Sequence, residues 1–155
     1  MISAIIPTRD SAEPLQVLLS ALVPAAIEGL VREVVVADAG STDITPVICD
    51  DAGARLIQGG LAAAARSARC DWLLVAPVDL RLLRGWHEIV ADHLKAGGGE
   101  ALVLGYGAPR GFLQRFKAPA QSAMLVRRAT VAEASRDLDV SSLRAKLGAR
   151  AMRLG

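Results

Sequence analysis

The chain has 155 residues, the size of one ordinary domain, and 52% of them are hydrophobic, so a sizeable core can be buried. Aromatic residues make up only 3% of the chain, so Val, Leu, Ile and Ala must build that core, as they do in the strands of parallel sheets. The formal net charge is +2, with acids and bases interspersed, which argues against a protein that coats nucleic acid.

The N-terminal segment predicts a strand followed by a helix. Residues 2–7 form a short apolar run that ends at a proline, which suits a buried strand. Asp10 followed by Glu13 resembles a capping box, and leucines then recur at helical spacing. We expect Pro24 to break or bend this helix, because proline lacks the backbone N–H that an interior turn uses.

The same alternation continues along the first two-thirds of the chain. Residues 33–37 (EVVVA) predict a second strand, and Thr45 before Pro46 predicts a helix N-cap with proline at the first helical position. Gly53 is expected to close that helix. Further strands are predicted at residues 55–58 and 72–76, and further helices at 61–69 and 86–94.

The last third is less regular. Its predicted strands are residues 101–104, 123–127 and 149–154, its predicted helices lie near Val131 and at 140–147, and residues 106–119 have the composition of a loop.

Strands that alternate with helices imply β-α-β units, and hence a mainly parallel sheet between two helical layers. The predicted fold is therefore a three-layer α/β sandwich formed by residues 1–155 as one domain. In such sheets, ligands bind beyond the carboxyl ends of the strands. This rule directs attention to three loops, at residues 8–10, 38–43 and 77–80.

The loop at residues 38–43 (DAGSTD) follows a predicted buried strand and precedes a predicted helix. Gly40 permits a tight turn, Asp38 could accept hydrogen bonds from a base or ribose, and Ser41 offers a hydroxyl beside free N–H groups. The alternative is an ordinary strand-to-helix turn, since these residue types favour turns in any case.

Asp79 lies just beyond the predicted strand 72–76. A carboxylate there could bind a hard divalent cation, which prefers oxygen ligands and bridges diphosphate oxygens. The alternative is a cap for a helix or turn that begins near Leu80.

Together these segments resemble family 2 glycosyltransferases of the GT-A fold. The segments IIPTRD, EVVVADAGSTDIT, GARLI and CDWLLVAPVDLRLLRGW follow the order and spacing of that family's motifs over residues 1–86, and SAMLVRR and RDLDVSSLRAKLGARAMRL match more weakly. The resemblance implies a nucleotide-binding half at residues 1–96 and a shortened acceptor-side half at 97–155. It also implies a nucleotide-diphosphate sugar donor, Mg²⁺ or Mn²⁺, and inversion at the anomeric carbon.

The resemblance also assigns roles to particular residues. Pro7, Thr8 and Asp38 fall where the family holds the nucleoside, and Asp79 falls on the second acid of the D-x-D motif, which binds the metal. Asp137 falls on the acid that is the usual candidate for the catalytic base.

The chain departs from the family pattern at several positions. Pro77 replaces the first acid of D-x-D, and Gly59, Gly60, Ala62, Arg136 and Asp10 replace other typical residues. Two alternatives therefore stay open. One is a catalytically impaired GT-A domain that binds a nucleotide or another protein, and the other, less favoured, is a nucleotidyltransferase.

The remaining signals concern location and assembly. Cys49 and Cys70 do not form a disulfide framework, no signal peptide is evident, and no apolar stretch approaches the roughly 20 residues that span a bilayer. A cytoplasmic protein is therefore expected. The basic last third is interpreted as a solvated face, with an anionic ligand or peripheral membrane contact as the alternatives, and homodimer formation stays open.

Overall fold

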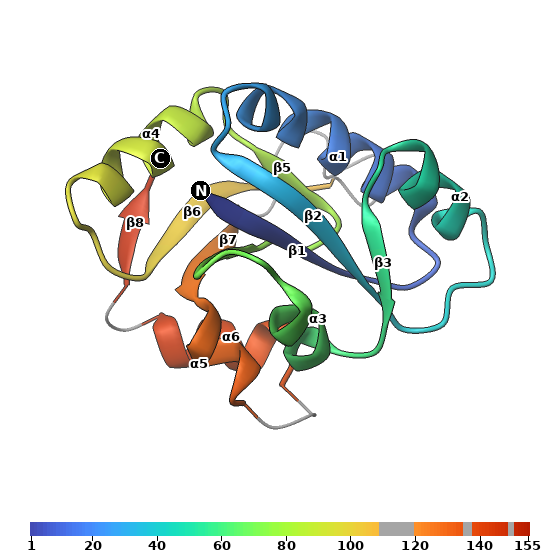
Figure 1. The fold of residues 1–155 in the computed structure, drawn as a ribbon. Helices are drawn as coiled ribbons and strands as arrows, with labels where there is room; N and C mark the ends of the chain where they lie inside the picture. Colours follow the sequence, from blue (N-terminus) through green and yellow to red (C-terminus); the bar gives the residue numbers. More distant parts are fainter. Residues whose placement is uncertain (109–119, 135–137, 149–150) are drawn as a thin grey trace.

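The computed structural model describes residues 1–108, 120–134, 138–148 and 151–155. These residues form the predicted three-layer α/β sandwich, with an eight-stranded sheet between two layers of helices (Figure 1). In chain order the elements are β1 (Ile2–Thr8), α1 (Ala12–Ile27), β2 (Val31–Asp38), α2 (Thr45–Asp51), β3 (Arg55–Gln58), α3 (Leu61–Ser67), β4 (Trp72–Val75), β5 (Leu80–Leu82), α4 (Trp86–Lys95), β6 (Ala101–Gly107), β7 (Ala120–Arg127), α5 (Arg128–Ala132), α6 (Val140–Leu147) and β8 (Met152–Leu154).

The sheet is parallel in its N-terminal half and mixed beyond it. Its strand order is β3-β2-β1-β4-β7-β6-β5, and β1 to β4 all run in the same direction. Strand β7 is antiparallel to β4 and β6, and β5 is antiparallel to β6. The outer edge of β6 is shared, because β8 pairs in parallel with its first residues and β5 pairs with its last.

Each face of the sheet is apolar and is covered by its own helices. Alternate side chains of β1, such as Ala4 and Ile6, pack with residues of α1, α2 and α4 in one buried cluster. Ile5 belongs to a second cluster, which packs against α3, α5 and α6 on the opposite face (Figure 1). Successive side chains of a strand point to opposite faces of the sheet, and both faces are buried. The strands therefore appear in the sequence as continuous apolar runs.

Helix α1 departs from the prediction at both of its ends. It continues through Pro24 to Ile27, so the expected break is wrong. Pro24 is exposed, and its carbonyl still accepts a hydrogen bond from Glu28 N at 3.0 Å, so only the proline's own N–H is missing from the helix. At the start of α1, Ser11 occupies the N-cap position without a side-chain cap, so the predicted capping box of Asp10 and Glu13 is wrong too.

Two further differences concern turns. Helix α2 begins at Thr45, so Thr45 is not the N-cap; Asp43 Oδ1 instead accepts a hydrogen bond from Thr45 N at 2.9 Å. Residues 80–82 form the short edge strand β5, where the sequence predicted a loop or the start of a helix. None of the helices in the described part of the chain has the length and apolar character needed to cross a bilayer.

Candidate functional site

A cavity of about 370 Å³ opens at the carboxyl edge of the parallel strands. Its walls come from the ends of β1 and β2, the start of α3, the turn after β4 and the start of α6. The lining residues are Pro7–Arg9, Ala37, Ala39, Gly59–Leu61, Val78 and Leu138–Val140. The cavity therefore lies where the sheet topology predicts a ligand.

Thr8 is the most informative residue of this cavity. It is only 6% exposed, and its hydroxyl oxygen Oγ1 is buried without a hydrogen-bond partner among the described residues. Most buried polar atoms in proteins are hydrogen-bonded, so a buried hydroxyl without a partner in a cavity wall calls for an explanation. Thr8 is therefore a candidate residue for contact with a ligand.

Two charged residues also line the cavity. Arg9 has an exposed side chain that lies 3.9 Å from the carboxylate of Asp10. Asp139 caps helix α6, because its Oδ1 accepts a hydrogen bond from Ser142 N at 2.6 Å, and the hydrogen bonds from Ser142 lower the pKa of Asp139. The rest of the lining is mainly apolar, so these two groups carry most of the charge at the cavity.

Asp38 lies beside the cavity as the register partner of Thr8 and is 1% exposed. Its carboxylate accepts hydrogen bonds from the Ser41 hydroxyl, from Ser41 N at 3.1 Å and from Gln58 Nε2 at 3.0 Å. Burial alone would raise the pKa of Asp38, but these hydrogen bonds lower it below its usual value. Asp38 therefore stays ionised and holds the turn at Gly40, whose φ of +85° suits glycine.

The loops after β1 and β2 are joined to each other by hydrogen bonds. Asp10 N donates to Ser41 Oγ at 2.9 Å, and Asp10 Oδ1 accepts from Thr42 N at 2.7 Å. Ala12 N donates to Asp43 Oδ2 at 3.2 Å, so the carboxylate of Asp43 accepts backbone hydrogen bonds at the N-termini of both α1 and α2. We call residues 10–12 and 41–43 the loop brace; it follows the cavity-lining Arg9 directly in the chain.

Asp79 lies in the turn between β4 and β5, next to the cavity-lining Val78. Its backbone carbonyl accepts a hydrogen bond from Ala108 N at 2.9 Å, and its Oδ1 accepts one from Gln121 Nε2 at 3.1 Å. Because Leu80 begins a strand, Asp79 does not cap a helix there. Asp38 and Asp79 thus follow strands at the same edge of the sheet, but Asp79 lies on the β7 side, across β1 and β4 from Asp38.

A divalent cation at Asp79 would need further oxygen ligands. Within the described ranges, no three His, Cys, Asp or Glu side chains lie close enough together to hold a metal ion, and Pro77 contributes no carboxylate. However, Gln121 Oε1 is buried and has no hydrogen-bond partner in the part of the chain that the structure describes. Carboxylate and amide oxygens are the donors that Mg²⁺ and Mn²⁺ accept, so this pair fits such an ion once phosphate oxygens complete the set.

The predicted site residues therefore divide into three groups. Pro7 and Thr8 line the cavity, Asp38, Gly40 and Ser41 form the turn beside it, and Asp79 lies further along the same edge. Asp137 lies outside the described residues, so its predicted role is untested. Sequence reasoning missed the contribution of residues 138–140, although Asp139 followed by Val-Ser-Ser is itself an N-cap signal.

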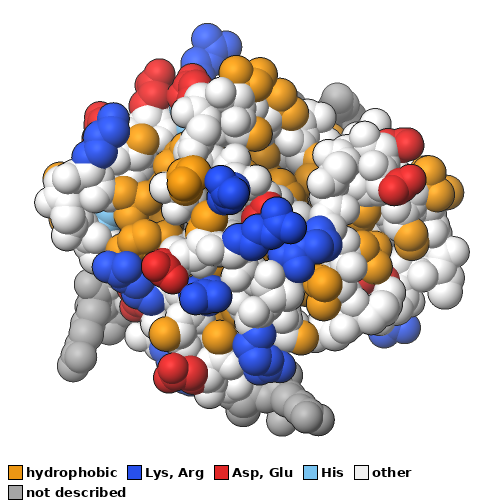
Figure 2. Space-filling view, in the orientation of Figure 1, with side chains coloured by type: hydrophobic (Ala, Val, Ile, Leu, Met, Phe, Trp, Pro, Cys, Tyr) orange, Lys and Arg blue, Asp and Glu red, His pale blue; other side chains and the backbone are white. Residues whose placement is uncertain are grey.

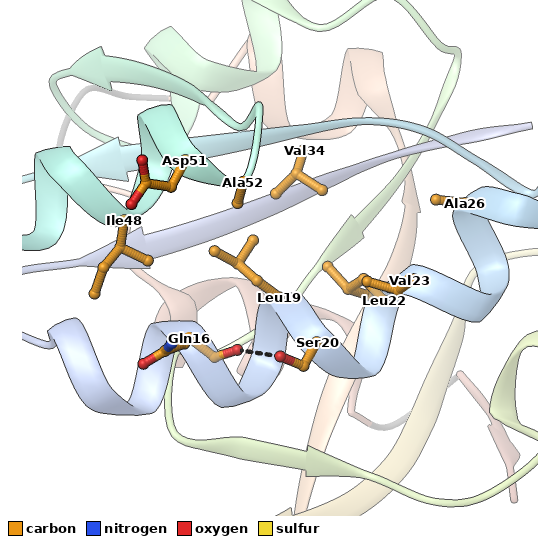
Figure 3. Close-up of a pocket in the computed structure, with 10 residues that line it drawn as sticks. All are labelled: Gln16, Leu19, Ser20, Leu22, Val23, Ala26, Val34, Ile48, Asp51 and Ala52. Atoms are coloured by element: carbon orange, nitrogen blue, oxygen red, sulfur yellow. Dashed lines mark hydrogen bonds between the residues drawn. The ribbon is translucent and has the colours of Figure 1, made fainter.

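Two other surfaces differ chemically from this cavity. Figure 3 shows a hollow of about 360 Å³ between α1 and α2, lined mostly by apolar side chains such as Leu19, Leu22 and Ile48. Figure 2 shows Lys and Arg side chains gathered over the middle of one face. The hollow offers no positive charge to a phosphate among its described lining residues, because the charged residue there is Asp51.

Comparison with known proteins points to one family. The sequence model of glycosyl transferase family 2 matches residues 3–129. A TPR repeat-containing protein of Synechococcus elongatus is 39% identical over 90 residues, which cover 52% of this chain and 21% of that protein.

Among solved structures, glucosyl-3-phosphoglycerate synthase from Mycobacterium tuberculosis, in complex with Mn²⁺, uridine diphosphate and phosphoglyceric acid, superposes with a TM-score of 0.55. It is 23% identical, and the match covers 66% of this chain and 41% of that one. A second mycobacterial protein superposes with a TM-score of 0.53 at 26% identity, over 66% of this chain and 39% of its own. The chain thus spans about two fifths of the solved structures it matches, and the likeness supports the GT-A fold.

Proposed function

Because the chain belongs to glycosyltransferase family 2, we propose that it binds a nucleotide-diphosphate sugar in the cavity beside β1 and β2 and transfers the sugar to an acceptor hydroxyl. The observation that carries this proposal is the cavity at the carboxyl edge of the parallel strands, whose lining includes the family's motif residues Pro7 and Thr8; the buried, unpartnered hydroxyl of Thr8 is the polar group that we assign to the ligand. The cavity volume of about 370 Å³ is within the range of small-molecule sites.

The binding residues suggest how a donor would lie. The apolar wall around Pro7 and Ala37 suits a base or ribose ring, and the Thr8 hydroxyl supplies a hydrogen bond to it. Arg9 offers a positive charge to the diphosphate. Asp38 acts mainly through the turn that it holds, since its carboxylate already accepts hydrogen bonds from Ser41 and Gln58.

The proposed reaction is a single displacement. The acceptor oxygen forms a bond to the anomeric carbon while the bond from that carbon to the diphosphate oxygen breaks, so the configuration inverts. The diphosphate leaves with the electron pair, and the acceptor proton passes to the carboxylate of Asp137. A divalent cation held by Asp79 would, when bound, neutralise charge on the departing diphosphate.

Calorimetry with UDP- and GDP-sugars and Mn²⁺ tests the proposal. We expect binding by the natural protein and a loss of about tenfold in affinity for Thr8→Val, the scale of one hydrogen bond left unmade in a site. Thr45→Val is the matched control, because its hydroxyl is equally buried and unpartnered within the described residues but does not line the cavity. No binding to any nucleotide sugar, or equal losses in both variants, would overturn the proposal.

A second candidate, binding without transfer, is favoured by Pro77, which stands where the family has an acid. Pro77→Asp separates the two functions. Donor hydrolysis or transfer by the natural protein supports the enzyme, whereas activity that appears only in Pro77→Asp supports a domain that has kept the donor site and lost the chemistry.

A further inference from the structure

Gln121 and Asp79 form an oxygen-rich pair at the carboxyl edge of the sheet. Gln121 lies near the start of β7, opposite Gly105 of β6, and Asp79 is fixed to the end of β6 through the hydrogen bond from Ala108 N to its carbonyl. Both residues are therefore held by hydrogen-bonded strands, and they meet directly, with Gln121 Nε2 donating to Asp79 Oδ1 at 3.1 Å.

The other end of the Gln121 amide is left without a partner. Its Oε1 is buried and accepts no hydrogen bond from the described residues. Most buried side-chain polar atoms have at least one partner, so such an oxygen beside a carboxylate marks either a local cost in stability or a binding function.

We propose that Gln121 provides a second oxygen ligand, beside Asp79, for a divalent cation, in place of the acid that the chain lacks at Pro77. The inference rests on the proposed function, because the phosphates of the donor would complete the ion's oxygen shell. It concerns a neutral residue on β7, which the D-x-D resemblance did not indicate.

The geometry of the pair supports this assignment. Rotating the side-chain amide of Gln121 by 180° about its last bond exchanges the positions of Oε1 and Nε2. The oxygen then lies where the nitrogen now lies, 3.1 Å from Asp79 Oδ1. Adjacent ligands in an octahedral shell with bonds of about 2.1 Å lie about 3.0 Å apart, so the two oxygens fit neighbouring corners around Mg²⁺ or Mn²⁺. After this rotation Nε2 would lie where the unpartnered Oε1 now lies, and the bound ion would replace the hydrogen bond between Nε2 and Asp79 Oδ1.

Pro77 explains why a replacement ligand would be needed. A single carboxylate binds a hard cation weakly. Such an ion takes six or more oxygen ligands, and the affinity of the protein for it falls with each protein ligand that is replaced by water. Gln121 adds an oxygen without adding charge, so the site would bind an ion more weakly than two acids do and would depend more on the donor's phosphates.

Nuclear magnetic resonance with Mn²⁺ alone tests the proposal without any nucleotide. Mn²⁺ is titrated into the ¹⁵N-labelled full chain, and its paramagnetic broadening is followed at the side-chain amide of Gln121 and the backbone amides of Val78 and Ala108. In the natural protein these signals should broaden before those of distant residues, and added Mg²⁺ should restore them.

Variants of Gln121 decide whether its oxygen matters. Gln121→Leu should raise the Mn²⁺ concentration that gives half-broadening at Val78 and Ala108 by about tenfold, the usual scale for losing a group around a bound metal. Gln121→Glu should bind Mn²⁺ at least as tightly as the natural protein. Gln16→Leu makes the same change on α1, away from the pair, and should have no effect.

Three outcomes would overturn the inference: no broadening around Asp79 in the natural protein, the same half-broadening concentration in Gln121→Leu, or weaker Mn²⁺ binding by Gln121→Glu. If Gln121→Leu does not fold, as its spectrum would show, the Glu variant still decides the question. Nucleotide binding measured separately in EDTA distinguishes failure of this inference from failure of the donor site.

Discussion

Thr8 and Asp38 are register partners at the ends of adjacent parallel strands, and both are buried, but their side chains are satisfied very differently. The carboxylate of Asp38 accepts hydrogen bonds from Ser41 and Gln58, whereas the hydroxyl of Thr8 has no partner in the described part of the chain. Asp38 therefore maintains the turn, whereas the Thr8 hydroxyl is the group to which the proposed function assigns a ligand contact.

The unpartnered hydroxyl of Thr8 should cost stability in the absence of ligand. Thr8→Val keeps the β-branched shape and removes a buried polar atom without a partner, so we expect it to raise the free energy of unfolding by about 1 kcal/mol. Thr45→Val should give a similar gain, since Thr45 Oγ1 is also buried without a partner there. Urea denaturation of both variants checks this; a loss of stability in Thr8→Val would mean that its hydroxyl is already satisfied.

Asp38 should make the stability of the protein depend on pH. Because its folded pKa lies below its unfolded value of about 3.8, its stabilising contribution is complete above that value and is lost as the pH falls through the folded pKa. Asp38→Asn should therefore lower the free energy of unfolding by about 1–3 kcal/mol at pH 7, the range for hydrogen bonds to a charged group.

The difference in the free energy of unfolding between the natural protein and Asp38→Asn should become smaller below about pH 4. Glu33, whose pKa is also lowered because hydrogen bonds from Arg69 N, Ser3 and Arg55 outweigh its burial, is present in both proteins, so the difference between them isolates Asp38. Denaturation curves at pH 7 and pH 3.5 give the comparison. An equal deficit at both pH values would show that charge is not involved.

The loop brace should tolerate asparagine but not alanine at position 10. Asp10 has a φ of +44°, which Asn adopts readily and Ala does not, and its Oδ1 accepts the hydrogen bond from Thr42 N. We expect Asp10→Asn to change the free energy of unfolding by less than about 0.5 kcal/mol and Asp10→Ala to lower it by about 1–2 kcal/mol. Thermal denaturation of the two variants measures this, and equal effects would contradict the role of the side-chain oxygen.

Gly105 should be irreplaceable for steric reasons. A Cβ there would lie 2.5 Å from the carbonyl oxygen of Arg81 on the neighbouring strand, and this backbone atom can give way only if β5 shifts relative to β6. Gly105→Ala should therefore lower the free energy of unfolding by about 1–3 kcal/mol or more. Gly99→Ala is the matched control, since nothing lies within 4 Å of its Cβ. Similar stabilities of the two variants in urea would show that β5 and β6 separate easily.

The sequence predicted the strands well, because apolar runs at 2–7, 33–37 and 72–76 become strands buried on both faces. It failed where short segments depend on tertiary contacts. The three-residue strand β5 contains Arg81 and lies at an edge, so no apolar run marks it. Asp10 looked like a local cap, but its oxygen bonds Thr42, a partner that only the fold brings near.

The candidate site was predicted in the same uneven way. Pro7 and Thr8 line the cavity, because their place at the end of a parallel strand decides their position, and their role toward a nucleoside stays a prediction. The wall formed by Leu138–Val140 could not be predicted, since it depends on how α6 packs across the sheet. The role that we propose for Gln121 could not be predicted from the sequence, because a neutral amide in a strand matches no motif and only the fold brings it into contact with Asp79.

The loop brace also affects how a donor molecule would enter. Residues 10–12 and 41–43 are joined by the hydrogen bonds of Asp10, Ser41 and Asp43, so opening either loop alone would break these bonds. A donor that binds next to these loops, as we propose, should lose little binding free energy to ordering them. The proposed donor site would then be preorganised next to the loop brace, so donors would be selected by how well they fit a surface that is already formed.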